Sequence, residues 1–180
     1  MKKWSLWMAM LGSLVFTFCE KAPEQQRTAL SPSRKYSYSE EEIDSFPFRE
    51  RIYVPIYSDI YHMSGENRFL LTATLSLRNT SPTDSVFVGR VHYYDSHGAM
   101  IRKYLEKAIV LAPLEAAEFV VEQKEKKGGA GASFLLEWGA RRPVSRPVFQ
   151  AIMIGTAHSQ GISFTTEGVV VESNLDAPPR

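Results

Sequence analysis

The stretch RFLLTATLSLRN at residues 68–79 decides the fold class of this chain. Every second residue from Phe69 to Leu77 is apolar, and from Thr72 onwards the residues between them are polar. In a β-strand, successive side chains point to opposite faces of the sheet. This alternation therefore predicts a strand with one buried and one exposed face, as in an antiparallel sheet.

Similar short patterns follow along the chain, separated by residues typical of turns. The sequence NTSPTD at 79–84 predicts a turn, and residues 86–95 and 100–105 predict a hairpin around the second turn, DSHG at 95–98. The apolar run 148–154 predicts a strand that is covered on both faces. Other predicted strands lie at 118–122, 134–138, 162–165 and 169–171.

No helical pattern of useful length follows residue 46. We therefore predict an all-β fold, an Ig-like antiparallel β-sandwich of about seven to nine strands. The predicted domain covers residues 46–175, and residues 176–180 are predicted to be a disordered tail. Antibody domains have a Cys…Trp…Cys pattern, which is missing here, so only the architecture is predicted.

The N-terminal sequence is typical of a bacterial lipoprotein signal. Lys2 and Lys3 precede a mostly apolar run at 4–18, and Cys19, the only cysteine, follows directly. The run is shorter than the roughly 20 apolar residues that span a membrane. Phe18 departs from the small residue that such signals prefer before the cysteine. An uncleaved anchor, with Cys19 as a bystander, is the alternative.

We accordingly predict a signal peptide at 1–18, lipidation of Cys19 and a flexible tether at 19–45, which is polar and without sustained periodicity. The partner of the anchor would be the cell-envelope membrane. Glu20 after the cysteine favours the outer membrane, with the domain facing the periplasm. Tyr36 and Tyr38 form the one aromatic pair in the tether, and docking of this pair on the domain is the alternative.

Composition excludes two classes of protein, nucleic-acid-binding domains and domains held together by internal disulfides. The net charge is +1 for the whole chain and −1 without Lys2 and Lys3, whereas a nucleic-acid-binding domain would have a strongly basic face. A single cysteine cannot form an internal disulfide, so stability must come from a packed core. The hydrophobic fraction of 44% is typical of a globular domain.

Seven short motifs in a consistent order resemble the bacterial domain-of-unknown-function family numbered 3124. The resemblance covers residues 52–172 and implies a small exported protein, often a lipoprotein, with no assigned activity and no catalytic residues to transfer. The motifs are VPIYS at 54–58, LSLRNT at 75–80, YYD at 93–95, GGAGA at 128–132, EW at 137–138, MIGT at 153–156 and QGISF at 160–164.

The loop at 124–132 is the first candidate for chemistry. Three lysines precede Gly128, Gly129 and Gly131, and glycines allow backbone N–H groups to converge on an anion. The Gly-Lys-Ser/Thr ending of a phosphate loop is missing, and a strand rather than a helix is predicted to follow. A flexible hairpin loop is the plainer interpretation.

Glu137 is the second candidate, on the exposed face of its strand beside Trp138. It could pair with Arg141 or Arg142, or act as a general acid if a second carboxylate or a base lay nearby. The turn around His158, Gln160 and Gly161 is a third candidate, because a polar loop with a glycine can line a binding rim. The predicted candidate ligand rim is thus Gly128, Gly129, Gly131, Glu137, Trp138, His158, Gln160 and Gly161.

No metal, cofactor or catalytic residue is predicted. His92, Asp95 and His97 flank one turn, but structural zinc sites use four protein ligands and catalytic sites three, and no paired cysteines or HExxH motif are present. No Gly-x-Ser-x-Gly motif is present either. We expect a membrane-anchored envelope lipoprotein with a non-catalytic binding or scaffolding domain, whose partner is an envelope protein or a small ligand. A ligand or metal sensor and an envelope hydrolase using Glu137 remain alternatives, since sandwiches host all three functions.

Overall fold

The computed structural model of the protein describes residues 36–157 and 160–175. The chain divides into two units, Met1–Arg34 and Lys35–Arg180, and every described residue belongs to the second unit. The predicted signal peptide, Cys19, His158 and the C-terminal tail at 176–180 lie outside the described residues.

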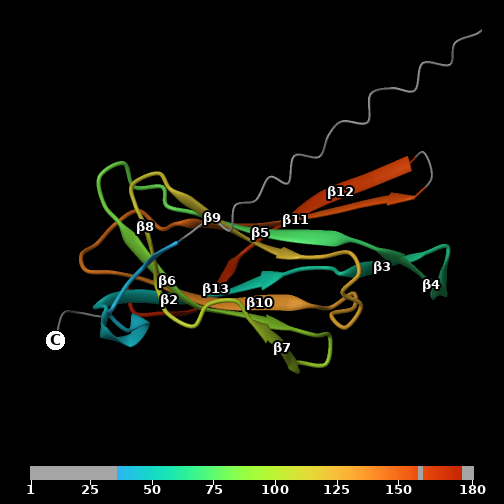
Figure 1. Cartoon of the computed structure of the whole chain (residues 1–180), viewed down its shortest axis with the longest axis horizontal. Coiled ribbons are helices and arrows are strands. Elements are labelled where there is room, and N and C mark those ends of the chain that lie inside the picture. Colours follow the sequence, from blue (N-terminus) through green and yellow to red (C-terminus); the bar gives the residue numbers. More distant parts are fainter. Residues whose placement is uncertain (1–35, 158–159, 176–180) are drawn as a thin grey trace, which may run out of the picture. The chain divides into compact units, whose positions relative to one another are not determined.

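The second unit is an antiparallel β-sandwich, as predicted. The strands of its two main sheets lie in two layers, which Figure 1 shows one above the other. The described residues form thirteen strands, more than the seven to nine predicted, because several are very short. The larger sheet has the order β1 (Ser37–Tyr38), β8 (Ile109–Leu111), β6 (Val86–Tyr94), β10 (Ser133–Ala140), β2 (Phe48–Pro55) and β13 (Val169–Ser173), and β7 (Met100–Lys103) also pairs with β6. The smaller sheet has the order β12 (Gln160–Glu167), β11 (Val148–Ala157), β5 (Thr72–Arg78) and β9 (Ala116–Val121).

A third, two-stranded sheet pairs β3 (Asp59–His62) with β4 (Ser64–Leu70). The end of β4 overlaps the stretch at 68–79. That stretch therefore forms parts of two strands, β4 and β5, rather than one. The break falls at Leu71, which is buried and whose N–H donates to the carbonyl of Ser58 at 2.9 Å. Beyond the break, β5 has the predicted pattern, because Ala73, Leu75 and Leu77 are all buried.

The main core lies between the two large layers. It combines the apolar face of β5 with residues of the larger sheet such as Phe134, Leu136 and Trp138. The prediction for 148–154 was wrong in one respect, since only one face of β11 is covered. Phe149 and Met153 are buried on the covered face, whereas Ile154, on the opposite face, is 51% exposed.

Residues 37–46 pack on the larger sheet, so the predicted tether at 19–45 is wrong for its last part. Strand β1 pairs with β8, and the short 3-10 helix η1 (Ile43–Ser45) places Ile43 over Gly89. The ring of Phe46 stacks on Phe87 with 4.2 Å between centroids and covers Gly139. These contacts form a second small core of buried apolar residues.

Tyr36 also docks on the domain, as the alternative interpretation expected. Its hydroxyl donates to the carbonyl of Glu118 at 2.9 Å, and its ring lies 5.7 Å from that of Phe119. Tyr38 does not bury its ring and is mostly exposed. No helix among the described residues is long and apolar enough to cross a membrane.

Candidate functional site

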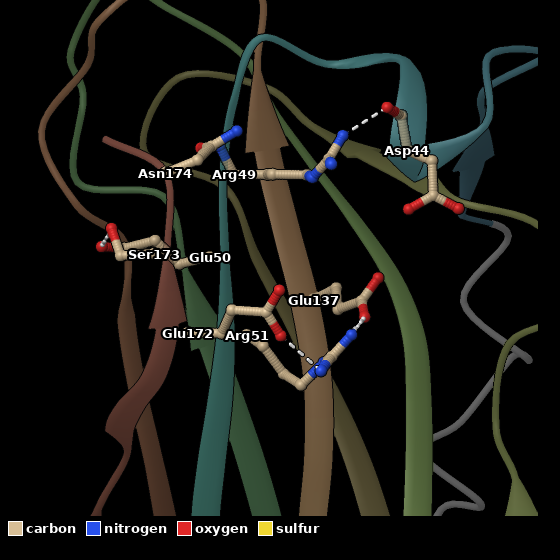
Figure 2. A pocket seen from close by; sticks show the side chains of 8 residues that line it. All are labelled: Asp44, Arg49, Glu50, Arg51, Glu137, Glu172, Ser173 and Asn174. Carbon is tan, nitrogen blue, oxygen red and sulfur yellow. Dashed lines mark hydrogen bonds and ion pairs between the residues drawn. The ribbon is translucent and has the colours of Figure 1, made fainter. Parts of the chain in front are cut away.

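A row of charged side chains crosses three strands of the larger sheet. Glu172 on β13, Arg51 on β2 and Glu137 on β10 are direct cross-strand neighbours. Arg51 donates to Oε1 of Glu137 from Nε at 3.0 Å and from Nη2 at 2.9 Å. Figure 2 shows its guanidinium lying between the two carboxylates, with its other end bound to Glu172. Opposite-charge cross-strand pairs of this kind stabilise a sheet.

Arg90 extends the row to a fourth strand by means of a β-bulge. The register between β6 and β10 shifts next to Glu137, and Arg90 has a φ of 52°, in the left-handed region. Bulges redirect side chains at functional positions and strand ends. Here Arg90 Nη1 donates to Oε2 of Glu137 at 2.5 Å, while Nη2 binds Asp44 of η1. Both oxygens of Glu137 are thus occupied by guanidinium groups.

These contacts shift the titration of the charged partners. Hydrogen bonding to Glu137 raises the pKa of Arg51, and hydrogen bonding to Asp44 raises the pKa of Arg90. The Arg90 guanidinium holds the pKa of Asp44 below its ordinary value. Charge-assisted hydrogen bonds of this network join η1 to four strands of the sheet.

The cleft beside this row has a volume of about 110 Å³. Its walls include Asp44, Arg51, Glu137 and Glu172, as Figure 2 shows. Pockets for drug-sized ligands have about 300–1,000 Å³. This cleft therefore suits ordered water or a single polar group of a partner better than a whole ligand.

A second row lies one residue further along, on the inward face. Ser173, Glu50 and Trp138 are cross-strand neighbours, and the carboxylate of Glu50 is fully buried. It accepts hydrogen bonds from Trp138 Nε1 at 3.1 Å and from Ser173 Oγ at 2.9 Å. Arg146 donates two more, from Nε at 2.7 Å and from Nη2 at 2.6 Å.

Burial opposes ionisation of Glu50, but the hydrogen bonds from Arg146 and Ser173 outweigh it and hold its pKa below the ordinary value. Glu50 therefore ties the loop that carries Arg146 to the sheet. Glu50 is not among the residues predicted from the sequence to have a role. A signal was present, because Glu50 occupies the same alternating positions as the apolar Ile52 and Val54.

The glycine loop lies elsewhere and lines a different recess, of about 450 Å³. Two serines hold it to the domain. Ser96 donates to the carbonyl of Gly128 from its N and its Oγ, both at 2.9 Å, and Ser58 donates to the carbonyl of Gly129 from its N and its Oγ, both at 3.2 Å. The loop, for which a flexible hairpin was the plainer prediction, is thus fixed at two successive carbonyls.

The structure separates the residues of the predicted rim. Trp138 belongs to the main core, and Glu137 is only 6% exposed rather than on an open face. The predicted partners of Glu137 were also wrong, because Arg141 pairs with Glu41 and Arg142 with Asp84.

The remaining predicted residues are equally scattered. Gln160 and Gly161 are exposed on β12 and line neither the cleft at Glu137 nor the glycine-loop recess. Asp95 accepts from the N–H groups of His97 and Ala99 in its own turn, each at 2.8 Å. Within residues 36–157 and 160–175, no group of three or more His, Cys, Asp or Glu side chains is placed to hold a metal ion.

Fold and site together define a small antiparallel β-sandwich protein with an arginine–carboxylate network across its larger sheet. A family model described as a protein of unknown function, DUF3124, matches residues 49–171. The chain belongs to this family, which confirms the resemblance seen in the sequence. No curated protein matches. A solved structure described as "Crystal Structure of Thermotoga maritima 1070" has 12% identity and a TM-score of 0.40, covering 69% of this chain and 96% of that one.

Proposed function

We propose that this protein is a cell-envelope lipoprotein whose β-sandwich is a non-catalytic domain that binds an envelope protein. In this proposal lipid on Cys19 holds the domain at the membrane, and residues 20–35 separate the two. The proposal for the anchor is supported by the sequence alone, where two lysines and a short apolar run precede the only cysteine.

The observation that carries the binding role is the separation of the reactive side chains. The cleft at Glu137 and the recess at the glycine loop have no lining residue in common. Arg51 lies between Glu137 and Glu172 and forms ion pairs with both, and the cleft that these carboxylates share has a volume of only about 110 Å³, too small for a sugar between them. A glycoside hydrolase needs two such groups flanking the bond that it cleaves. The hydrolase alternative has no comparable support.

The larger sheet offers a surface that suits a protein partner. Tyr53 on β2 and Val169 on β13 are paired in register, and both are exposed together with Val171. Strand β13 is also the last strand of its sheet. Exposed apolar side chains at the end of a sheet, next to charged ones, are typical of protein-binding surfaces.

Two variants of the full chain test the two halves of the proposal. Cys19→Ser should move the protein from the membrane fraction to the soluble envelope fraction, and a variant that still pellets with membranes would contradict lipid anchoring. For the binding role, the lipidated protein is cross-linked in its own envelope and purified. One partner should be recovered specifically, and Val169→Asp should abolish its recovery.

The matched control is Val120→Asp, which introduces the same charge at an exposed valine on β9 of the other sheet. Circular dichroism shows whether both variants fold. Equal loss of the partner in both variants, or no partner with the unmodified chain, would contradict binding through β13.

A further inference from the structure

We propose that the recess over the glycine loop binds the phosphate group of a small molecule or of a lipid headgroup. The recess lies between three separate parts of the chain. Tyr61 and Arg68 come from the β3–β4 pair, Ser96 and His97 from the turn after β6, and the loop itself supplies residues 127–131. Its volume of about 450 Å³ falls within the range of ligand pockets.

The charge of the lining favours an anion. Arg68 and Lys127 are cationic, and none of the lining residues carries a carboxylate. Asp59 is buried and does not line the recess, but it pairs with Arg68 at 2.5 Å and offsets its charge, so the net positive charge of the lining comes from Lys127. The whole chain has a net charge of only +1, so this local excess of positive charge does not follow from a basic composition.

The loop backbone adds hydrogen-bond donors. The carbonyls of Gly128 and Gly129 point at Ser96 and Ser58, respectively. In a trans peptide the C=O and the following N–H point in opposite directions, so the N–H groups of Gly129 and Ala130 point away from these serines. Neither N–H has a hydrogen-bond acceptor among the described residues. Gly129 has a φ of 76°, a left-handed conformation that brings successive N–H groups together around an anion.

Packing beneath the loop fixes this arrangement in advance. A Cβ on Gly128 would lie 1.9 Å from the buried hydroxyl of Tyr93, so the loop rests directly on the core. Ser96 Oγ also accepts the N–H of Gly131 at 2.8 Å. A site whose donors are already ordered avoids the entropy cost of ordering a loop on binding. The exposed ring of Tyr61, with Arg68 4.0 Å from its centroid, provides a wall for the rest of the ligand.

The test is a titration of the full chain with inorganic phosphate. Binding is measured by the ¹H–¹⁵N NMR signals of the Gly129 and Ala130 amides. We expect both signals to shift and to saturate. Lys127→Gln should weaken binding about fivefold, the effect of one unit charge near a phosphate in water. Lys126→Gln is the matched control, because the neighbouring lysine carries the same charge but does not line the recess, and it should change binding less than about twofold.

Two further probes distinguish the source of the phosphate. Tighter binding of glycerol 3-phosphate than of inorganic phosphate indicates a soluble ligand, and Lys127-dependent shifts with phosphatidylglycerol bicelles alone indicate a lipid headgroup. Amide signals that do not shift with any probe, or equal weakening by both lysine substitutions, would overturn the proposal. This result is independent of the partner captured through β13, because the two experiments use different surfaces.

Discussion

Glu50 shows how much the stability of this protein depends on single buried residues. Its carboxylate is fully buried, and four hydrogen bonds offset the cost of removing the charge from water. Glu50→Gln should lower the free energy of unfolding at pH 7 by about 2 kcal/mol, the typical value of hydrogen bonds to a charged group. Chemical denaturation measures the loss, and Glu66→Gln, an exposed residue of β4, is a control that should have almost no effect.

The same residue gives the stability a defined pH dependence. Its pKa is lower in the folded protein than the ordinary value of 4.5, so its contribution is fully present above pH 4.5 and is lost as the pH falls through the folded pKa. Denaturation curves of the unmodified protein should therefore lose stability below that pH more steeply than those of Glu50→Gln. Parallel curves would mean that folding does not lower the pKa of Glu50.

Gly128 and Tyr93 form a second residue-level test. The hydroxyl of Tyr93 is buried without a hydrogen-bond partner, and burial raises its pKa to about 12. Gly128→Ala should destabilise the fold by about 1–3 kcal/mol, because the new Cβ would overlap that hydroxyl. Tyr93→Phe removes the hydroxyl, so it should be neutral or stabilising alone. In the double variant it should restore part of the loss, because Oγ of Ser58 would still lie 2.8 Å from the new Cβ. Gly65→Ala, which meets no atom within 4 Å, is the control.

The sequence predicted individual residues well only where their role followed from alternation along one strand. Alternation placed Leu75 and Leu77 in the core, and it assigned Phe134 and Leu136 to the same face of one strand. It did not find the partners of Glu137, because Arg51 and Arg90 meet it only through the pairing of distant strands. The left-handed bulge at Arg90 has no local signal either, since arginine rarely adopts that conformation.

At the scale of elements, strands with period-two patterns were predictable and the packing of residues 36–46 was not. That segment has only two well-buried apolar residues, Ile43 and Phe46, and no repeat that would mark it as part of the domain. Ile43 packs against Gly89 and Phe46 against Gly139, and the missing side chains of these glycines leave room on the larger sheet. A surface built from two glycines on different strands cannot be recognised along the sequence.

Phe46→Ala tests whether this segment belongs to the domain. Phe46 stacks on Phe87 and is almost fully buried, so its truncation should cost about 3–5 kcal/mol. Tyr38→Ala changes an aromatic residue of the same segment that is mostly exposed, and it should cost less than about 1 kcal/mol. The midpoint and slope of urea denaturation measure both. A small effect of Phe46→Ala would show that residues 36–46 act as a tether after all.

At the scale of the whole sandwich, two layers were predictable but the assignment of strands to layers was not. Strands β12 and β13 are separated in the chain only by Gly168, yet β12 pairs with β11 in the smaller sheet and β13 with β2 in the larger one. Strands that change sheets in this way make the corners of sandwiches. Each strand alone has an ordinary pattern, and only the glycine between them indicates a change of direction.

Gly168 lies against residues of both layers, and its substitution should therefore affect the whole domain. A Cβ there would be 2.7 Å from Cγ2 of Ile52 in the larger sheet and 3.0 Å from Cβ of Phe149 in the smaller one. Gly168→Ala should lower the free energy of unfolding by about 1–3 kcal/mol through this overpacking. Gly161→Ala, on β12 and with ordinary contacts at 3.8 Å, should have little effect. Because the clash involves both sheets, tryptophan fluorescence and far-UV circular dichroism should report one coincident, shifted transition, and separate transitions would show that the two sheets unfold independently.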